Sequence, residues 1–270
     1  MSDIFDPNTE VFAQIDGSMG RITLNRPEKK NAMSQAMWTR VADAVSALDT
    51  VPEVRVIILC SSTPTSFSAG ADISELEVIA TDPVRREANR EAIREAQRSL
   101  ARAKKPTIAQ ISGPCVGGGC GLAIHCDFRF ASDAARFGIT PAKLGIIYPL
   151  NDTKQLMDLV GVSAAKSMLF TGRLLGAIEA EKIGLIDRLT TADALNKAVE
   201  EFAGELAVVS QYSIHGIKHN MQRILDGQVD DDKQSEKMFL DAHESDDAVE
   251  GVKAFLAKRP AKFTWFHGGD

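Results

Sequence analysis

The stretch Gly113-Pro-Cys-Val-Gly-Gly-Gly-Cys-Gly121 carries the prediction of the fold. It follows the apolar run 107–111, which is typical of a buried strand, and leads into 122–126, which is typical of the start of a helix. A glycine run between a strand and a helix exposes backbone N–H groups where the helix dipole favours negative charge. Such a turn can hold a phosphate, a carboxylate or an oxyanion, although a tight turn without a ligand is the plainer interpretation.

A second loop of small residues, Ser68-Ala-Gly-Ala71, follows the β-branched run 54–59. If the strands before the two loops are neighbours in one sheet, both loops emerge on the same side, and two N–H groups can point at one oxygen. That arrangement is an oxyanion hole, in which each donor typically stabilises the transition state by about 3 kcal/mol. Two tight turns without a function explain the pattern equally well.

Composition narrows the class of protein. The chain has 270 residues, 44% of them hydrophobic, which suits one large domain with a sizeable core. The net charge of −6 is spread without a basic patch, which argues against nucleic acid as a partner. No apolar run approaches the ~18 residues of a membrane span, and the polar first residues lack a signal-peptide pattern, so we expect no membrane contact and a cytoplasmic location.

The cysteines indicate reduced thiols rather than a metal or disulfide site. They lie in or beside apolar runs and form no C-x-x-C pair, so a zinc site that includes His125 is a remote alternative. We therefore predict no metal. The four cysteines are Cys60, Cys115, Cys120 and Cys126.

Predicted strands and helices alternate through the first two thirds of the chain, which favours an α/β fold. A hairpin is expected within 11–24, helices at 34–48 and 82–103, short strands at 128–131 and 135–137 joined by a turn, a helix from about 151, and an edge strand at 186–189. Four further helices fill most of the remaining chain. No linker separates independent domains.

Several motifs together resemble the crotonase (enoyl-CoA hydratase/isomerase) superfamily. They include Asn25-Arg-Pro-x-x-x-Asn31, Phe67-Ser-Ala-Gly-Ala-Asp-Ile73, Gly117-Gly-Gly-Cys120, Thr171-Gly172 and Lys258-Arg259, in the order of that family. The resemblance implies a core of spiralling β-β-α units over residues 1–200 and a C-terminal helical oligomerisation segment over 201–270. It also implies a homotrimer or hexamer.

The resemblance further implies an enzyme that acts on a coenzyme A thioester. Coenzyme A enters only as part of the substrate, and no other cofactor is expected. The N–H groups of Ala71 and Gly118 would form the oxyanion hole, Arg26 and Lys29 would lie near the phosphates, and Lys258 would reach the coenzyme A of a neighbouring subunit. The residues that the resemblance assigns to coenzyme A are Arg26, Lys29, Ala69, Ala71, Asp72, Ile73, Gly118 and Lys258.

The sequence departs from the hydratases at both catalytic glutamates. The first lies directly after Gly-Gly-Gly-Cys and is Gly121 here, whereas the second lies four residues before the glycine of Leu-Gly and is Pro141. Neither residue has a side chain that can move a proton. General acid–base catalysis typically supplies roughly 10²–10⁴-fold, so another group must replace the glutamates if the protein is a catalyst.

Candidate replacements follow in the stretch 137–152. Thr140, Tyr148 and Asp152 lie there, and the stretch partly resembles the methylmalonyl-CoA decarboxylase branch, which carries a histidine where this chain has Ala71. Each candidate also has a structural interpretation: a turn at Thr140, a core aromatic at Tyr148 and a helix N-cap at Asp152. At a helix N-terminus the pKa of Asp152 should be depressed.

His125 falls on the same helix face as Gly121, four residues later, although packing alone would explain it. The sequence thus predicts an acyl-CoA-transforming enzyme that stabilises a thioester enolate. The alternatives are a malonyl-type decarboxylase and a non-catalytic acyl-CoA-binding protein. A dinucleotide-binding protein fits less well, because the glycine run lacks the G-x-G-x-x-G pattern.

Overall fold

Seven strands form the central sheet of the computed structural model, which describes residues 2–266. Their order is β1 (Ser2–Asp3), β2 (Val11–Asp16), β3 (Met19–Leu24), β4 (Val56–Ser61), β5 (Thr107–Ile111), β7 (Phe128–Ser132) and β10 (Arg188–Thr190). The first three strands are antiparallel, which confirms the predicted hairpin, and the strands from β3 to β10 are parallel. The edge strand predicted near 186–189 is β10, displaced by one or two residues.

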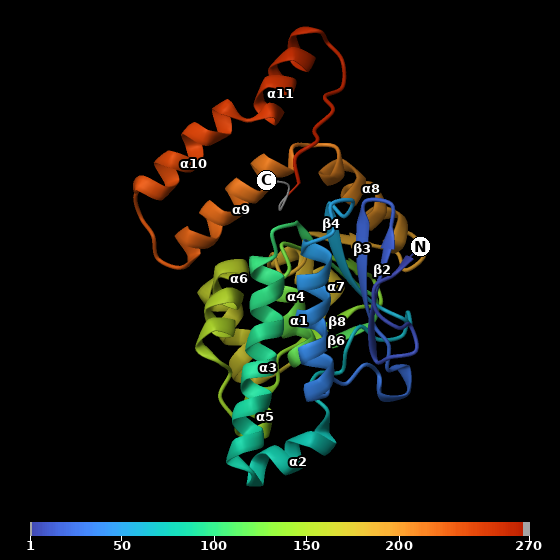
Figure 1. Cartoon of the computed structure of the whole chain (residues 1–270). Coiled ribbons are helices and arrows are strands. Elements are labelled where there is room, and N and C mark those ends of the chain that lie inside the picture. Colours follow the sequence, from blue (N-terminus) through green and yellow to red (C-terminus); the bar gives the residue numbers. More distant parts are fainter. Residues whose placement is uncertain (1, 267–270) are drawn as a thin grey trace.

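Strands β4 and β5 are parallel neighbours, as the two-loop argument requires. Ile58 pairs with Ile108, and Leu59 pairs with Ala109. Five of the six β4 residues are buried, because the sheet is covered on both faces. One face packs against helices α1 and α3, and the other packs against α8 (Figure 1). The loops that follow β4 and β5 therefore leave the same edge of the sheet.

Helices α1 (Gln35–Asp49), α2 (Ile73–Thr81) and α3 (Pro83–Arg102) each begin after an N-cap residue, and α1 and α3 confirm the helices predicted at 34–48 and 82–103. The Ser34 hydroxyl accepts a hydrogen bond from the backbone N–H of Met37, and the Asp82 carboxylate accepts from Val84 and Arg85. Asp72 caps α2 in the same way. These caps set where the helices that surround the small-residue loop begin.

A second, three-stranded sheet lies beside the glycine run. It consists of β6 (Pro114–Val116), β8 (Arg136–Gly138) and β9 (Leu175–Gly176). The prediction that 128–131 and 135–137 are joined strands is right about the strands, but β7 and β8 belong to different sheets. The helix predicted from 122 begins earlier, as α4 (Gly118–Ile124), because the glycines themselves adopt helical geometry.

Three helices follow the small sheet's first two strands: α5 (Pro141–Leu144), α6 (Leu150–Thr171) and α7 (Ala177–Lys182). Helix α6 is interrupted at Gly161, whose φ of 73° is not helical. Its N-cap is Pro149, so the structural interpretation of Asp152 as the N-cap is wrong, since Asp152 lies inside the first turn.

The C-terminal helices are α8 (Leu195–Ala207), α9 (Gln211–Leu225), α10 (Lys233–Glu244) and α11 (Asp246–Leu256). Helix α8 packs on the sheet, whereas α9, α10 and α11 extend away from it (Figure 1). The α/β fold is confirmed. The boundary at 200 and the assembly role of 201–270 stay predictions, and residues 1 and 267–270 lie outside the described residues.

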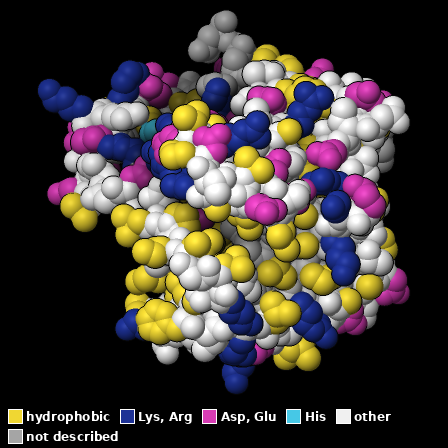
Figure 2. All heavy atoms as spheres, turned by 90° about the horizontal axis from the view of Figure 1, so that it is seen from below, with side chains coloured by type: hydrophobic (Ala, Val, Ile, Leu, Met, Phe, Trp, Pro, Cys, Tyr) yellow, Lys and Arg dark blue, Asp and Glu magenta, His cyan; other side chains and the backbone are white. Residues whose placement is uncertain are grey.

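The surface at the end that carries α2 and α5 is hollowed, and hydrophobic side chains gather around the hollow (Figure 2). Exposed apolar side chains of these segments include Ile73, Leu144, Ile146 and Ile147. Within residues 2–266, none of the helices combines the length and the apolar character needed to cross a membrane.

Candidate functional site

The two small-residue loops meet. Gly70 has a φ of +97°, and a Cβ added to it would lie 3.0 Å from the carbonyl oxygen of Val116 and 3.5 Å from the nitrogen of Gly118. Gly117 has a φ of +53°, and a Cβ there would lie 3.6 Å from the Cα of Gly70. Positive φ and close backbone approach both favour glycine at these positions. The absence of side chains is what allows the loops to touch.

The backbone N–H groups of Ala71 and Gly118 lie close together. A Cβ on Gly118 would be 3.8 Å from the nitrogen of Ala71. Met33 holds the chain on both sides of Ala71, since its N–H donates to the carbonyl of Gly70 at 2.7 Å and its carbonyl accepts from Asp72 at 2.9 Å. Among residues 2–266, neither Ala71 N–H nor Gly118 N–H donates to any protein acceptor. Two backbone donors without a protein acceptor therefore lie near each other.

Gly121 lies one turn further along α4 and faces a group of polar side chains. A Cβ added to it would lie 2.7 Å from Nε2 of Gln97, 3.7 Å from the Tyr148 hydroxyl and 3.9 Å from Oδ2 of Asp152. The place where the sequence lacks a carboxylate is thus occupied by side chains from α3, from the segment before α6 and from α6 itself.

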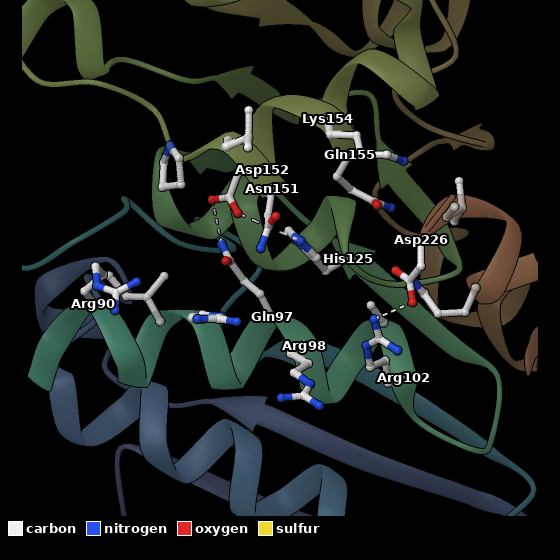
Figure 3. Close-up of a pocket in the computed structure, with 17 residues that line it drawn as sticks. Arg90, Gln97, Arg98, Arg102, His125, Asn151, Asp152, Lys154, Gln155 and Asp226 are labelled. Carbon is white, nitrogen blue, oxygen red and sulfur yellow. Dashed lines mark hydrogen bonds and ion pairs between the residues drawn. The ribbon is translucent and has the colours of Figure 1, made fainter. Parts of the chain in front are cut away.

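Asp152 is the carboxylate of this group. Its side chain is buried and its Oδ2 accepts a hydrogen bond from Nε2 of Gln97 at 3.0 Å (Figure 3). Burial raises the pKa of Asp152 above its ordinary value, against the opposing effects of His125 and the Gln97 hydrogen bond. The expected depression of the pKa is therefore wrong in sign, because burial disfavours the charged carboxylate more than His125 and Gln97 stabilise it.

His125 belongs to the same group. Its Nδ1 is 2.7 Å from the carbonyl oxygen of Gly121, so Nδ1 carries the proton, and its Nε2 is 3.9 Å from Oδ1 of Asp152. Burial lowers the pKa of His125, although the Gly121 carbonyl and the Asp152 charge act in the opposite direction. The His125 side chain is packed in the interior, as the structural interpretation of this residue predicts, and it also lies beside the Asp152 carboxylate.

Tyr148 has a buried hydroxyl with no hydrogen-bond partner among residues 2–266. Burial raises the pKa of its phenol well above the ordinary value, and the nearby Asp152 adds to the effect. The phenol therefore stays protonated and has a donor to offer. Buried hydroxyls without partners are uncommon in proteins, so this one points to a bound molecule or water.

Thr140 was a candidate site residue but makes no contact within residues 2–266 that supports this role, whereas Gln97 was not a candidate and belongs to the polar group. Thr140 precedes α5, where its carbonyl accepts from Lys143, and its side chain makes no hydrogen bond within the described chain. Gln97 was not predicted, because the charged helix 82–103 reads as a solvated face. The available signal is its spacing: it lies four residues after Ile93 and three before Leu100, on the inward face of α3.

The residues assigned to coenzyme A do not form one cluster. Arg26 is paired with Asp72 at 2.7 Å and with Glu10 at 3.0 Å. Hydrogen bonds from Ser74, together with Arg26, lower the pKa of Asp72 to about 2, so this pair supports the loop structurally. Ala69 donates its N–H to the carbonyl of Lys30.

The other assigned residues lie at the surface. The side chains of Lys29, Ile73 and Lys258 are exposed. Lys258 follows α11 with a φ of 51°. Their contacts with coenzyme A stay predictions.

A cavity of about 810 Å³ reaches the polar group from outside, between α3, α6 and the end of α9 (Figure 3). Its inner wall includes Gln97, His125 and Asp152. Arginines of α3, the helix that also carries Gln97, line the cavity as well, and Arg102 is paired there with Asp226 at 2.7 Å. A buried carboxyl of raised pKa beside a cavity is a common arrangement for acid–base chemistry.

Comparisons with known proteins match the sequence over nearly its full length. The family model described as enoyl-CoA hydratase/isomerase matches residues 14–265. A probable enoyl-CoA hydratase of Mycobacterium bovis is 32% identical over 255 residues, covering 94% of this chain and 97% of the relative. A crotonyl-CoA hydratase of Syntrophomonas wolfei is 32% identical over 262 residues, covering 94% and 97%.

Solved structures agree with these sequence relatives. An enoyl-CoA hydratase/isomerase family protein from Hyphomonas neptunium has a TM-score of 0.92 and 39% identity, covering 95% of this chain and 98% of the other. An enoyl-CoA hydratase from Bacillus anthracis has a TM-score of 0.86 and 27% identity, covering 95% and 99%. The chain therefore belongs to the enoyl-CoA hydratase/isomerase family of enzymes, within the crotonase superfamily.

Proposed function

We propose that this enzyme moves a proton on the acyl group of an acyl-CoA thioester, through an enolate held by the N–H groups of Ala71 and Gly118. The two N–H groups lie together and have no other acceptor within residues 2–266, which is what an oxyanion requires. Glycine at 70 and 117 leaves room for the thioester carbonyl to approach. Each donor should contribute about 3 kcal/mol to the transition state.

Asp152 is the proposed acid and base. The observation that carries this role is that its Oδ2 lies 3.9 Å from the point where a side chain on Gly121 would begin. Its carboxylate takes a proton from a carbon next to the thioester carbonyl, and the electron pair moves onto the carbonyl oxygen to give the enolate. The carboxyl then returns the proton to the same carbon or to another carbon conjugated with the enolate. The raised pKa suits a group that must both take and give a proton near neutral pH.

Tyr148 is proposed to donate a hydrogen bond to the substrate. Its hydroxyl is buried, protonated and without a protein acceptor in the described chain, so a substrate oxygen can accept from it without breaking an existing bond. The same phenol suits a second candidate reaction, decarboxylation of a malonyl-type thioester. There it would hold the departing carboxylate while the enolate forms at Ala71 and Gly118.

Hydration by paired carboxylates fits the geometry less well. Gly121 has no side chain, and Pro141 opens α5 without a group that can move a proton. Asp152 supplies the acidic group among the three heavy atoms nearest to the Cβ position on Gly121. A single carboxyl can transfer one proton back and forth, whereas activation of water and protonation of carbon normally use two groups.

Deuterium exchange tests the proposed chemistry directly. Butyryl-CoA incubated in D₂O with the protein should gain deuterium next to the carbonyl, seen by mass spectrometry, and Asp152→Asn should abolish the gain. A parallel panel of 3-enoyl, crotonyl and methylmalonyl thioesters reports isomerisation, hydration and release of carbon dioxide. Carbon dioxide release without exchange would favour the decarboxylase, and binding without any reaction would favour a non-catalytic role.

The assembly is also part of the proposal. Helices α9 to α11 extend from the core and expose apolar side chains, and three or six copies that buried them would account for both features. These side chains include Ile217, Ile224, Phe239, Leu240, Val252 and Phe255. Light scattering after gel filtration should give three or six times the 29.2 kDa chain mass.

A further inference from the structure

A row of arginines runs along α3 on the wall of the cavity. Arg90, Arg94, Arg98 and Arg102 are spaced by four residues, so they lie on one side of the helix (Figure 3). All four line the cavity that reaches Gln97 and the carboxyl of Asp152. The cavity therefore joins the proposed site of proton transfer to a strongly cationic surface.

The two middle arginines have no ion-pair partner within residues 2–266. Arg90 pairs with Glu87 on its own helix, and Arg102 pairs with Asp226 across the cavity. Arg94 and Arg98 lie four residues apart on α3, so they are about one helical turn from each other. Two guanidinium groups at this spacing without a counter-charge favour binding of an anion.

The other side of the cavity mixes polar and apolar side chains. Asn151 and Gln155 of α6 line it beside Leu150, and Lys154 lines it while paired with Asp158 at 2.6 Å. A hydrocarbon chain gains free energy from apolar walls, and here such walls are interrupted by charged and amide groups along both helices. The cavity suits an acyl group with a polar, negatively charged end better than a long alkyl chain.

The position of the cavity identifies which part of a thioester would enter it. Its lining residues include Asp152, the proposed base, and none from the loop 68–72 or from 117–121, where the carbonyl would bind. Since Asp152 acts on acyl carbons, the space beyond it belongs to the rest of the acyl group. The phosphates of coenzyme A lie at the other end of the thioester.

Resting on the proposed function, we propose that the substrate is an acyl-CoA whose acyl chain ends in a carboxylate, and that Arg94 and Arg98 bind this carboxylate. A guanidinium donates two parallel N–H groups to a carboxylate, which gives both charge and geometry. The two arginines would then select dicarboxylic acyl groups over alkyl ones. They determine specificity and do not take part in proton transfer.

The test is a matched pair of ligands measured by isothermal titration calorimetry. Glutaryl-, adipyl- and suberyl-CoA are compared with pentanoyl-, hexanoyl- and octanoyl-CoA, so that each pair differs only in the terminal carboxylate. The full-length protein should bind at least one dicarboxylic member about tenfold tighter than its partner, as expected for a charged hydrogen bond. The preference should weaken with added salt.

Variants assign the preference to the two arginines. The double variant Arg94→Gln/Arg98→Gln should bind both members of the pair alike, with an unchanged affinity for the alkyl member. Arg85→Gln is the matched control, because Arg85 is an exposed arginine of the same helix that does not line the cavity. It should keep the preference in full. Thermal denaturation checks that all variants are folded.

Three outcomes would overturn the proposal, and the first two leave the proposed function standing. Equal binding of both members by the unmodified protein removes the specificity but leaves acyl-CoA chemistry intact. Equal weakening of both members in the double variant would assign the arginines to the phosphates of coenzyme A. Absence of binding by every thioester would overturn the proposed function and this inference together.

Discussion

Nε2 of Gln97 donates a hydrogen bond to Oδ2 of Asp152 over 3.0 Å, and this contact joins helix α3 to helix α6. It lies where a side chain on Gly121 would begin. Gly121 has no side chain, and the space beside it holds a carboxyl from a different helix with an amide that orients it.

Asp152→Asn should lower kcat by about 10²–10⁴, because the amide cannot take or return a proton. Affinity for a saturated thioester should change by less than about threefold, since Asn keeps the oxygen that accepts from Gln97. Steady-state kinetics and calorimetry measure the two quantities. Asp158→Asn, an exposed carboxylate on the same helix, should leave both unchanged. Retention of full turnover by the Asp152 variant would remove Asp152 from the mechanism.

Tyr148→Phe should separate activity from stability. Its hydroxyl is buried without a partner in the described chain, so removing it should leave the free energy of unfolding unchanged or raise it by about 1 kcal/mol. Turnover should nevertheless fall about tenfold or more, because the substrate loses a donor. Urea unfolding and kcat measure the two effects. A clear loss of stability would mean that the hydroxyl has an unseen structural partner.

Gly121→Ala should disturb the carboxyl indirectly. The new Cβ would lie 2.7 Å from Nε2 of Gln97, which must move away from Asp152. Because the Gln97 hydrogen bond lowers the pKa of Asp152, its loss should raise that pKa further and shift the acidic limb of the kcat/KM profile to higher pH. Gly204→Ala, in α8 with no atom within 4 Å of its Cβ, should leave the profile unchanged.

The stability of the folded chain should depend on pH through the titration of Asp152. Its folded pKa is raised, so its protonated form stabilises the fold fully below the ordinary pKa of 3.8, and that contribution is lost as pH rises through the folded value. Wild type should therefore lose stability relative to Asp152→Asn as pH increases from about 4. His125, whose folded pKa is lowered, acts oppositely and adds stability as pH rises toward 6.5. Urea unfolding at several pH values measures the difference, and parallel curves would contradict the raised pKa.

Gly70→Ala should damage both the loop and the proposed oxyanion hole. The φ of +97° and the Val116 carbonyl 3.0 Å away predict a loss of roughly 1–3 kcal/mol of stability and a displaced Ala71 N–H. Gly227→Ala is the control, because Gly227 has a φ of +105° but no atom within 4 Å of its Cβ. It should lose stability without losing activity. If Gly70→Ala and Gly227→Ala have equal kcat and KM, the loop that contains Gly70 does not contribute to catalysis.

Much of the fold was predictable, because local signals determine it. Ser34 and Asp82 are N-caps by residue type, and the run that forms β4 is continuous because both faces of a parallel sheet are buried. The pairing of β4 with β5 was a condition of the argument about their loops, and the structure meets it. The separation of β7 and β8 into different sheets was not predictable, because a short turn is compatible with either arrangement.

The site was predicted in part, for a physical reason. Asp152 and Tyr148 come from a stretch that resembles a known motif, but Gln97 comes from a helix whose pattern is mostly solvated charge. Its role depends on tertiary contact with α6, which no local pattern encodes. The sign of the pKa shift at Asp152 also depends on burial, which the position of the residue near a helix start does not reveal.

The register in which β4 pairs with β5 determines whether the two N–H groups of the proposed oxyanion hole can reach one oxygen. The pairing of Ile58 with Ile108 fixes how far each loop extends beyond the sheet. A slip of two residues, the smallest that keeps the same faces buried, would move one loop by about 6.6 Å relative to the other. Two N–H groups could not then reach one oxygen. Interior aliphatic residues that do not contact the substrate thus keep the two N–H groups of the proposed oxyanion hole aligned.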